Sequence, residues 1–202
     1  MDIGALLQAF IYLISSSLLY PVLFMLVFLT LLIILYAGSF FAEWIEISRL
    51  EKYLPQKLPG LIRSGEFSKY VSHRVKEYIR SLKEIINRNE EVELSVENLL
   101  QETTVRIWKS MDKYRIMVRV GPALGLLGTL IPMGTGLAAL GQGDMTKLSS
   151  DLVIAFTTTV VGLGIGTLAF FIYTVKRRWL EIDIKNMELA TEIMMSSNGE
   201  DK

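Results

Sequence analysis

The chain has 202 residues, no cysteine, a single histidine, and 21 basic and 21 acidic residues. Without cysteine neither a disulfide nor a thiolate metal site can form, and the sequence predicts no metal and no cofactor. No G-x-x-x-x-G-K-[ST] loop is present, and basic residues interleave with acidic ones, so neither a nucleotide-using enzyme nor nucleic-acid binding is indicated. Hydrophobic residues make up 51% of the chain, which favours a membrane protein. Because no catalytic motif is found, we do not expect an enzyme.

The N-terminal region is a long apolar stretch, because residues 3–42 contain no charged side chain. As one helix it would be about 60 Å long, roughly twice the hydrocarbon core of a bilayer. Three serines at 15–17 and then Pro21 are the expected place for a break, since proline suits the first turn of a helix. We therefore predict an external or interfacial helix over residues 1–20 and a transmembrane helix over residues 21–42. The alternative is a tight hairpin of two spans.

Two further segments, residues 118–140 and 152–175, are long and apolar enough to span a membrane. An external connector, residues 141–151, would join them. Lysine and arginine crowd residues 43–117 and follow the last span at residues 176–178. By the positive-inside rule the N-terminus lies outside, residues 43–117 form a cytoplasmic helical domain, and residues 176–202 form a cytoplasmic helix and tail.

The predicted cytoplasmic domain consists of helices that extend the membrane spans. Pro55 and Pro59 are expected to end the extension of the first span. Residues 65–89 predict a charged helix, and the helix that follows it is expected to run into the second span without a break before Gly121. The apolar face of the charged helix comprises Val71, Val75, Tyr78, Ile79, Leu82 and Ile86.

Small and hydroxyl-bearing residues recur at helical spacing in the last two spans. Such stripes allow membrane helices to pack closely, and their hydroxyls can line a polar path. Plain packing, with hydroxyls bonded back to their own helix, is the competing interpretation. The stripes comprise Gly121, Gly125, Gly128, Thr129, Pro132 and Gly136 in one span and Ala155, Thr158, Thr159, Gly162 and Gly166 in the other.

Three consecutive threonines, Thr157 to Thr159, cover about 200° of a helix, so not all can face one path. Thr159 is the first candidate and Thr158 the second. No acid or base lies between residues 121 and 140 or between residues 152 and 175. Threonine cannot carry a proton at neutral pH, so one subunit alone has no titratable group in its membrane core, and a carrier must come from elsewhere.

Two segments resemble the MotA/TolQ/ExbB proton channel family: Gly-Pro-Ala-Leu-Gly-Leu-Leu-Gly-Thr at 121–129 and Ala-Phe-Thr-Thr-Thr-Val-Val-Gly-Leu at 155–163. Three spans and an outside N-terminus are similar to ExbB and TolQ. The resemblance implies an all-α membrane protein that forms a homopentameric bundle in the inner membrane, surrounded by lipid. It also implies that two copies of a single-span partner of the ExbD, TolR or MotB type occupy the central pore, where the partner's aspartate carries the ion.

The resemblance assigns the ion path to Thr129 and Thr159, and the stripes of this sequence add Thr158 and Pro132 as candidates. The resemblance assigns close helix packing to Gly125, Gly128 and Gly162, and the stripes add Gly121, Gly136 and Gly166. This chain departs from the family at Ile154, where ExbB and TolQ have a glutamate, and at Pro132, where the family has glycine. Asp151, one helical turn before Ile154, is a possible ion entry residue.

The expected function is therefore that of a channel or stator subunit that couples proton or sodium flow to mechanical work. The alternative is a non-conducting oligomeric scaffold that holds a partner helix, which the loss of the glutamate at Ile154 favours.

Overall fold

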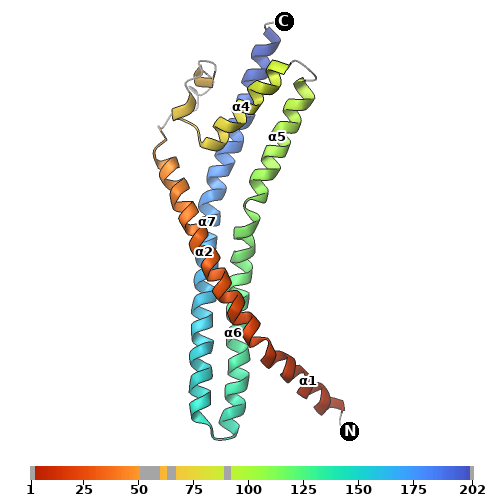
Figure 1. Cartoon of the computed structure of the whole chain (residues 1–202), viewed down its shortest axis with the longest axis vertical. Helices are drawn as coiled ribbons and strands as arrows, with labels where there is room; N and C mark the ends of the chain where they lie inside the picture. The colour runs from red at the N-terminus through yellow and green to blue at the C-terminus, as the bar shows by residue number, and fades with distance from the viewer. Residues whose placement is uncertain (1–2, 51–59, 63–66, 89–91, 201–202) are drawn as a thin grey trace. The chain divides into compact units, whose positions relative to one another are not determined.

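The structure, a computed structural model, describes residues 3–50, 60–62, 67–88 and 92–200. Within these residues the fold is helical and contains no strand, which confirms the all-α prediction (Figure 1). Three helical stretches of the described chain are long and apolar enough to cross a membrane, Ala9–Ser48, Val92–Gly141 and Met145–Ser196. The elements are α1 (Ile3–Ser17), α2 (Leu19–Ser48), the 3₁₀ helix η2 (Phe67–Lys69), α4 (His73–Arg88), α5 (Val92–Lys109), α6 (Asp112–Gly141) and α7 (Met145–Glu200).

The predicted break in the N-terminal apolar stretch lies at Leu18, between α1 and α2. The Leu18 amide donates to both Ile14 O and Ser15 O at 3.2 Å, and the Ser17 hydroxyl donates to Leu13 O at 2.8 Å. Serine hydroxyls that bond back to the preceding turn bend helices, and Pro21 follows within the first turn of α2. The interfacial position of the N-terminal helix stays a prediction.

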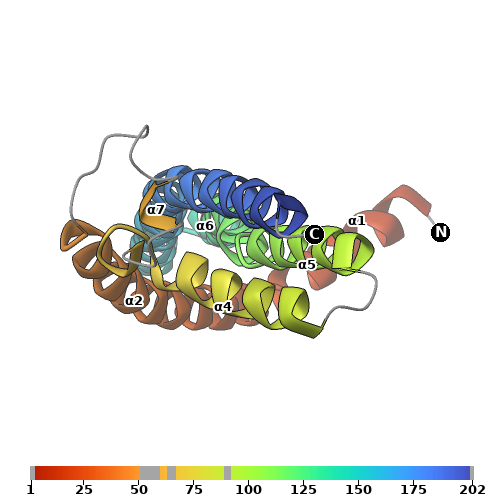
Figure 2. The same cartoon turned by 90° about the horizontal axis from the view of Figure 1, so that it is seen from above.

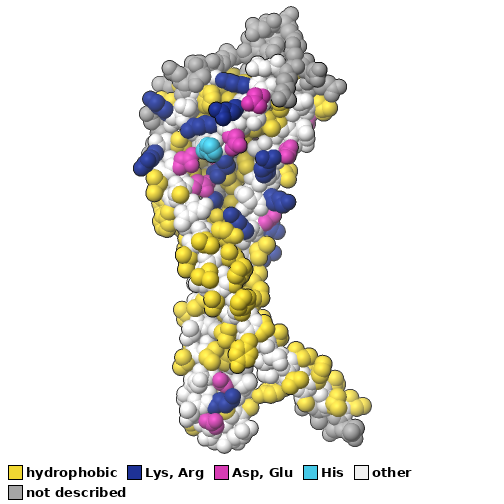
Figure 3. Space-filling model, viewed as in Figure 1, with side chains coloured by type: hydrophobic (Ala, Val, Ile, Leu, Met, Phe, Trp, Pro, Cys, Tyr) yellow, Lys and Arg dark blue, Asp and Glu magenta, His cyan; other side chains and the backbone are white. Residues whose placement is uncertain are grey.

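The chain forms two compact units. Unit 1 contains the described residues of Met1–Gly38 and Lys113–Tyr173, and unit 2 those of Ser39–Asp112 and Thr174–Lys202. On the face shown in Figure 3, hydrophobic side chains dominate the surface of unit 1, whereas Lys, Arg, Asp and Glu side chains are spread over unit 2.

Unit 1 is built on an antiparallel pair, α6 and α7, joined by a short turn (Figure 1). Gly143 in this turn has φ = 79°, a conformation that glycine adopts without strain. Asp144 Oδ1 accepts a hydrogen bond of 2.9 Å from the Lys147 amide and so caps the start of α7. The connector predicted over residues 141–151 is therefore mostly helix, because α7 already begins at Met145.

Helix α2 contributes one narrow stripe to the core of unit 1. Its buried side chains recur every three or four residues, while Phe24, Val27 and Leu31 between them are exposed. A helix that is apolar on all sides but buried on only one is typical of a membrane span whose other faces meet lipid or another subunit. The buried stripe comprises Val22, Leu26, Leu29 and Ile33.

Unit 2 contains the predicted charged helix, but α4 begins at His73, later than the predicted Gly65. Of its predicted apolar face, Val75, Tyr78, Ile79 and Leu82 are buried, Ile86 is half-buried, and Val71, also buried, lies just before the helix. Helix α5 packs against α4 (Figure 2). Pro55 and Pro59, expected to end the first helix, lie outside the described residues.

The uninterrupted helix expected before Gly121 is wrong, because α5 ends at Lys109 and α6 begins at Asp112. The Ser110 hydroxyl bonds to Ile107 O at 2.6 Å and the Met111 amide to Trp108 O at 2.9 Å, which tightens this turn. The Met111 side chain is buried there.

Candidate functional site

The site lies in unit 1, where α6 and α7 approach closely through glycine. A β-carbon added at Gly162 would lie 2.6 Å from Gly125 Cα and 2.7 Å from Gly121 O. One added at Gly166 would lie 2.5 Å from Pro122 Cγ. These distances leave no room for a side chain, so the two backbones touch along this part of the seam. The structure thus brings together four glycines assigned to packing, Gly121, Gly125, Gly162 and Gly166.

Nearer the α6–α7 turn, Gly128 faces Thr158. A β-carbon added at Gly128 would lie 2.7 Å from the Thr158 β-carbon. Thr158 is buried and donates to Ile154 O and Ala155 O on its own helix, at 3.0 and 2.9 Å. Its hydroxyl is therefore satisfied within α7 and its methyl group packs on α6. Thr158 has the geometry of a packing residue.

Thr129 and Thr159 face each other across the seam with their hydroxyl oxygens in contact. Thr129 Oγ1 also lies 2.9 Å from Gly125 O and 3.3 Å from Ala155 O. Thr159 donates to Ala155 O at 3.0 Å. Both side chains are half-buried, so the pair is reachable from one side of the helix pair.

The hydroxyl pair has spare acceptor capacity. Each threonine hydroxyl has one proton to donate and two lone pairs to accept with. Even with both protons engaged, lone pairs remain that can accept a hydrogen bond from a protonated carboxyl group or coordinate a partly dehydrated cation. Thr157, the third threonine of the run, is exposed and bonds back to Val153 O at 2.8 Å, away from the pair.

A second polar contact lies closer to the α6–α7 turn. The Thr135 hydroxyl donates to Asp151 Oδ2 at 2.7 Å. The absence of a side chain at Gly136 makes room for Asp151, because a β-carbon added at Gly136 would lie 3.3 Å from the Asp151 β-carbon. Both Thr135 and Asp151 are half-buried. Asp151 lies two helical turns from Thr159 on the same face of α7, because eight residues is close to two turns.

Two more residues named from the sequence belong to this seam. Pro132 is buried inside α6, one turn beyond the hydroxyl pair, and its carbonyl accepts a hydrogen bond from Thr135 at 3.0 Å. Ile154 is half-buried. Sequence reasoning missed Thr135, although it is the only hydroxyl in the apolar part of α6 besides Thr129.

A buried charge cluster in unit 2 was also missed. Arg74 on α4 donates to Glu43 on α2 and, at 3.0 Å, to Asp183 on α7. The other oxygen of Glu43 lies 2.6 Å from Lys176 Nζ. No sequence signal links these residues, because Arg74 and Asp183 are 109 positions apart.

The two carboxylates of this charge cluster respond differently to their surroundings. Burial alone would raise the pKa of Glu43, but hydrogen bonds from Lys176 and Arg74 outweigh it and lower the pKa below its usual value. Burial raises the pKa of Asp183, and the nearby Arg74 charge offsets only part of this. Glu43, with two cationic partners, is therefore the better stabilised anion of the two.

Three apolar helical stretches with a glycine-packed seam define a multi-pass helical membrane protein. The model of the MotA/TolQ/ExbB proton channel family matches residues 67–189, more than half of the chain. The chain belongs to this family, whose members are channel or stator-like subunits and not enzymes.

A similar protein is one named as a biopolymer transport ExbB homolog of Methanothermobacter thermautotrophicus, which is 26% identical over 137 residues. The aligned region covers 67% of this chain but 48% of that protein, so the chain spans about half the length of the curated relative that it matches. No solved structure matches the chain.

Proposed function

We propose that this chain is the channel subunit of an inner-membrane motor driven by the proton or sodium motive force. Five copies would surround two copies of a single-span partner of the ExbD, TolR or MotB type, with the N-terminus outside and the C-terminus in the cytoplasm. The observation that carries the proposal is the Thr129–Thr159 hydroxyl pair, which lies between two apolar segments, residues 121–140 and 152–175, that contain no acid or base.

The chemistry of the seam supports a carrier supplied by a second protein. An isolated charge in the membrane core is costly, and here none is present between residues 121 and 140 or 152 and 175. A partner aspartate that alternates between protonated and ionised forms could donate to, or share a cation with, the paired hydroxyls. The channel subunit would then supply the polar lining and the partner the titrating group.

The proposed path begins at Asp151. Its carboxylate is held by Thr135 near the α6–α7 turn, on the same face as Thr159. A negative charge at the mouth of a narrow path raises the local concentration of cations. Asp151 would thus take over ion entry in a chain where the family glutamate is replaced by Ile154.

Replacing Thr159 by valine is expected to reduce ion flux roughly 10- to 100-fold, which corresponds to losing a hydrogen bond to a charged group worth about 1.5–3 kcal/mol. The complex purified from native membranes through this chain would be reconstituted in liposomes, with proton and sodium uptake followed under an imposed gradient. Thr157→Val is the matched control, because Thr157 is exposed and bonds only within α7. Equal flux in the two variants would favour the scaffold, since a non-conducting holder of a partner helix does not need the paired hydroxyls.

Replacing Asp151 by asparagine is expected to reduce flux about three- to tenfold at low ion concentration and much less near saturation, because an entry charge acts by concentrating cations. Asparagine keeps the acceptor for Thr135, so the local geometry survives. Asp144→Asn removes the same charge from the neighbouring turn while preserving the helix cap. The same flux assay, run over a series of ion concentrations, compares the Asp151→Asn and Asp144→Asn variants. A loss that persists at saturating ion would assign Asp151 to a later step.

A further inference from the structure

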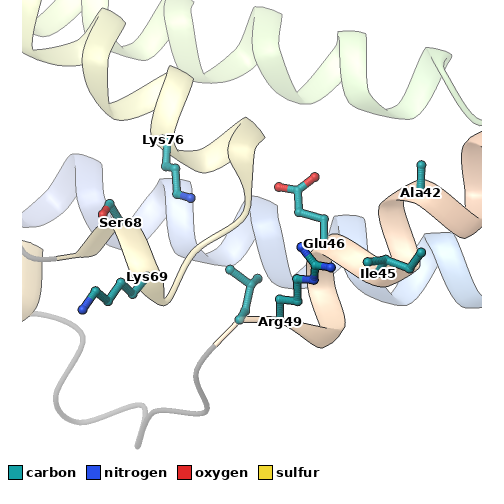
Figure 4. A pocket seen from close by; sticks show the side chains of 8 residues that line it. Ala42, Ile45, Glu46, Arg49, Ser68, Lys69 and Lys76 are labelled. Atoms are coloured by element: carbon teal, nitrogen blue, oxygen red, sulfur yellow. The ribbon is translucent and has the colours of Figure 1, made fainter.

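A groove of ≈ 460 Å³ opens in unit 2 beside the C-terminal end of α2, and nothing in the proposed ion path uses it. Three separate elements line it: α2 and the residues that follow it, the 3₁₀ helix η2, and α4 (Figure 4). Its lining residues are Ala42, Ile45, Glu46, Arg49, Leu50, Ser68, Lys69 and Lys76.

The groove is positively charged. Among the described residues that line it, Arg49, Lys69 and Lys76 contribute three cations and Glu46 contributes one acid. Glu46 Oε1 already accepts a hydrogen bond of 3.0 Å from the His73 amide. Within the described part of the chain, none of the three cations is paired with a carboxylate.

Two of these side chains reach toward Glu46 from different elements. In Figure 4 the Arg49 guanidinium, just after the end of α2, lies beside the Glu46 side chain, and the Lys76 side chain extends from α4 with its ammonium end turned toward Glu46. Lys69 extends toward the outer edge. A guanidinium and an ammonium that approach from different elements can bind two oxygens of one phosphate group.

One wall of the groove is apolar and lies at the level expected for lipid head groups. Ala42 and Ile45 are exposed on α2, the latter by 54%. Phe41 and Trp44 are also exposed, with their rings stacked at 6.3 Å between centroids, as in the aromatic belts that mark a membrane interface. Arg49 follows Trp44 by five residues, about 7.5 Å along a helix, which is close to the thickness of one head-group layer.

We propose that this groove binds the phosphodiester head group of an anionic phospholipid. Arg49 and Lys76 hold the phosphate oxygens, Lys69 adds positive charge at the edge, and Ala42 and Ile45 contact the first part of an acyl chain. The bound lipid would bridge the C-terminal end of α2 and the start of α4, both of which belong to unit 2. This site is independent of ion conduction through the α6–α7 seam.

The test is a lipid titration of the delipidated full-length protein, followed by native mass spectrometry. Dioleoylphosphatidylglycerol is expected to bind at least about tenfold more tightly than dioleoylphosphatidylcholine of the same chain length. The double variant Arg49→Gln/Lys76→Gln is expected to lose about 30-fold in affinity for phosphatidylglycerol, the factor for removing two interfacial cations. The control Arg80→Gln/Lys109→Gln removes two exposed cations outside the groove and is expected to change this affinity less than about twofold.

A third variant covers the case in which the double variant does not fold. Glu46→Gln removes the one acid among the described lining residues but keeps an oxygen for the His73 amide, so phosphatidylglycerol should bind several-fold more tightly. The proposal is overturned if Glu46→Gln leaves the affinity unchanged, or if the control variant loses as much as the groove variant. If millimolar inorganic phosphate displaces the lipid, the assignment of a lipid is overturned in favour of a soluble phosphate compound. If the groove binds lipid only after the oligomer dissociates, the proposal is also overturned, because the groove is then covered by a contact between copies of this chain.

Discussion

Replacing Gly162 by alanine is expected to separate α6 from α7 and abolish ion flux. The new methyl group would lie 2.6 Å from Gly125 Cα and 2.7 Å from Gly121 O, and backbone atoms on a packed helix cannot move aside as a flexible side chain can. Overpacking of this kind costs about 1–3 kcal/mol. The separation also matters for function, because Thr159 lies one turn from Gly162 and must stay in contact with Thr129.

The control for this prediction is Gly164→Ala, two residues further along the same helix. Nothing lies within 4 Å of the position that its β-carbon would take, so the same chemical change meets open space there. Alanine is also the better helix former. We expect thermal stability in detergent and flux in liposomes to fall for Gly162→Ala and to be retained for Gly164→Ala. Equal behaviour of the two variants would contradict the close seam.

Replacing Arg74 by methionine is expected to destabilise unit 2 by about 3 kcal/mol, at the low end of the range for breaking a buried ion pair. The low end applies because the Arg74 side chain is 31% exposed, whereas those of Glu43 and Asp183 are 13% and 7% exposed. Without Arg74, the largely buried Glu43 keeps its ion pair with Lys176, whereas the largely buried Asp183 loses its ion pair with Arg74. Unfolding can be followed by the fluorescence of Trp44 and Trp179, which both belong to unit 2.

Two further variants separate the loss of this charge cluster from a general effect of losing an arginine. Arg106→Met breaks only an exposed pair with Glu102, which is expected to cost about 0.3–0.5 kcal/mol. Adding Asp183→Asn to Arg74→Met removes one uncompensated charge, so we expect it to restore part of the lost stability. If the second substitution makes the protein less stable still, the cost of Arg74→Met does not come from an unpaired carboxylate.

The sequence was sufficient where one helix determines the answer by its own periodicity. The three apolar stretches, the break near the serines at 15–17 and the core face of α4 are properties of local composition and spacing, and the structure contains all three. The glycine and threonine stripes were visible for the same reason, because residues three or four apart share a helix face. The family resemblance rested on these stripes, and the family match confirms it.

Only the tertiary structure decided which polar groups meet. Thr158 and Thr159 are adjacent in sequence, yet one packs on Gly128 and the other faces Thr129, a choice set by the rotation of α7 against α6. The Thr135–Asp151 contact and the Arg74 charge cluster likewise join residues from different helices. Helical periodicity specifies the face on which a side chain lies, but the partner on that face depends on how the helices pack, which one helix's sequence does not contain.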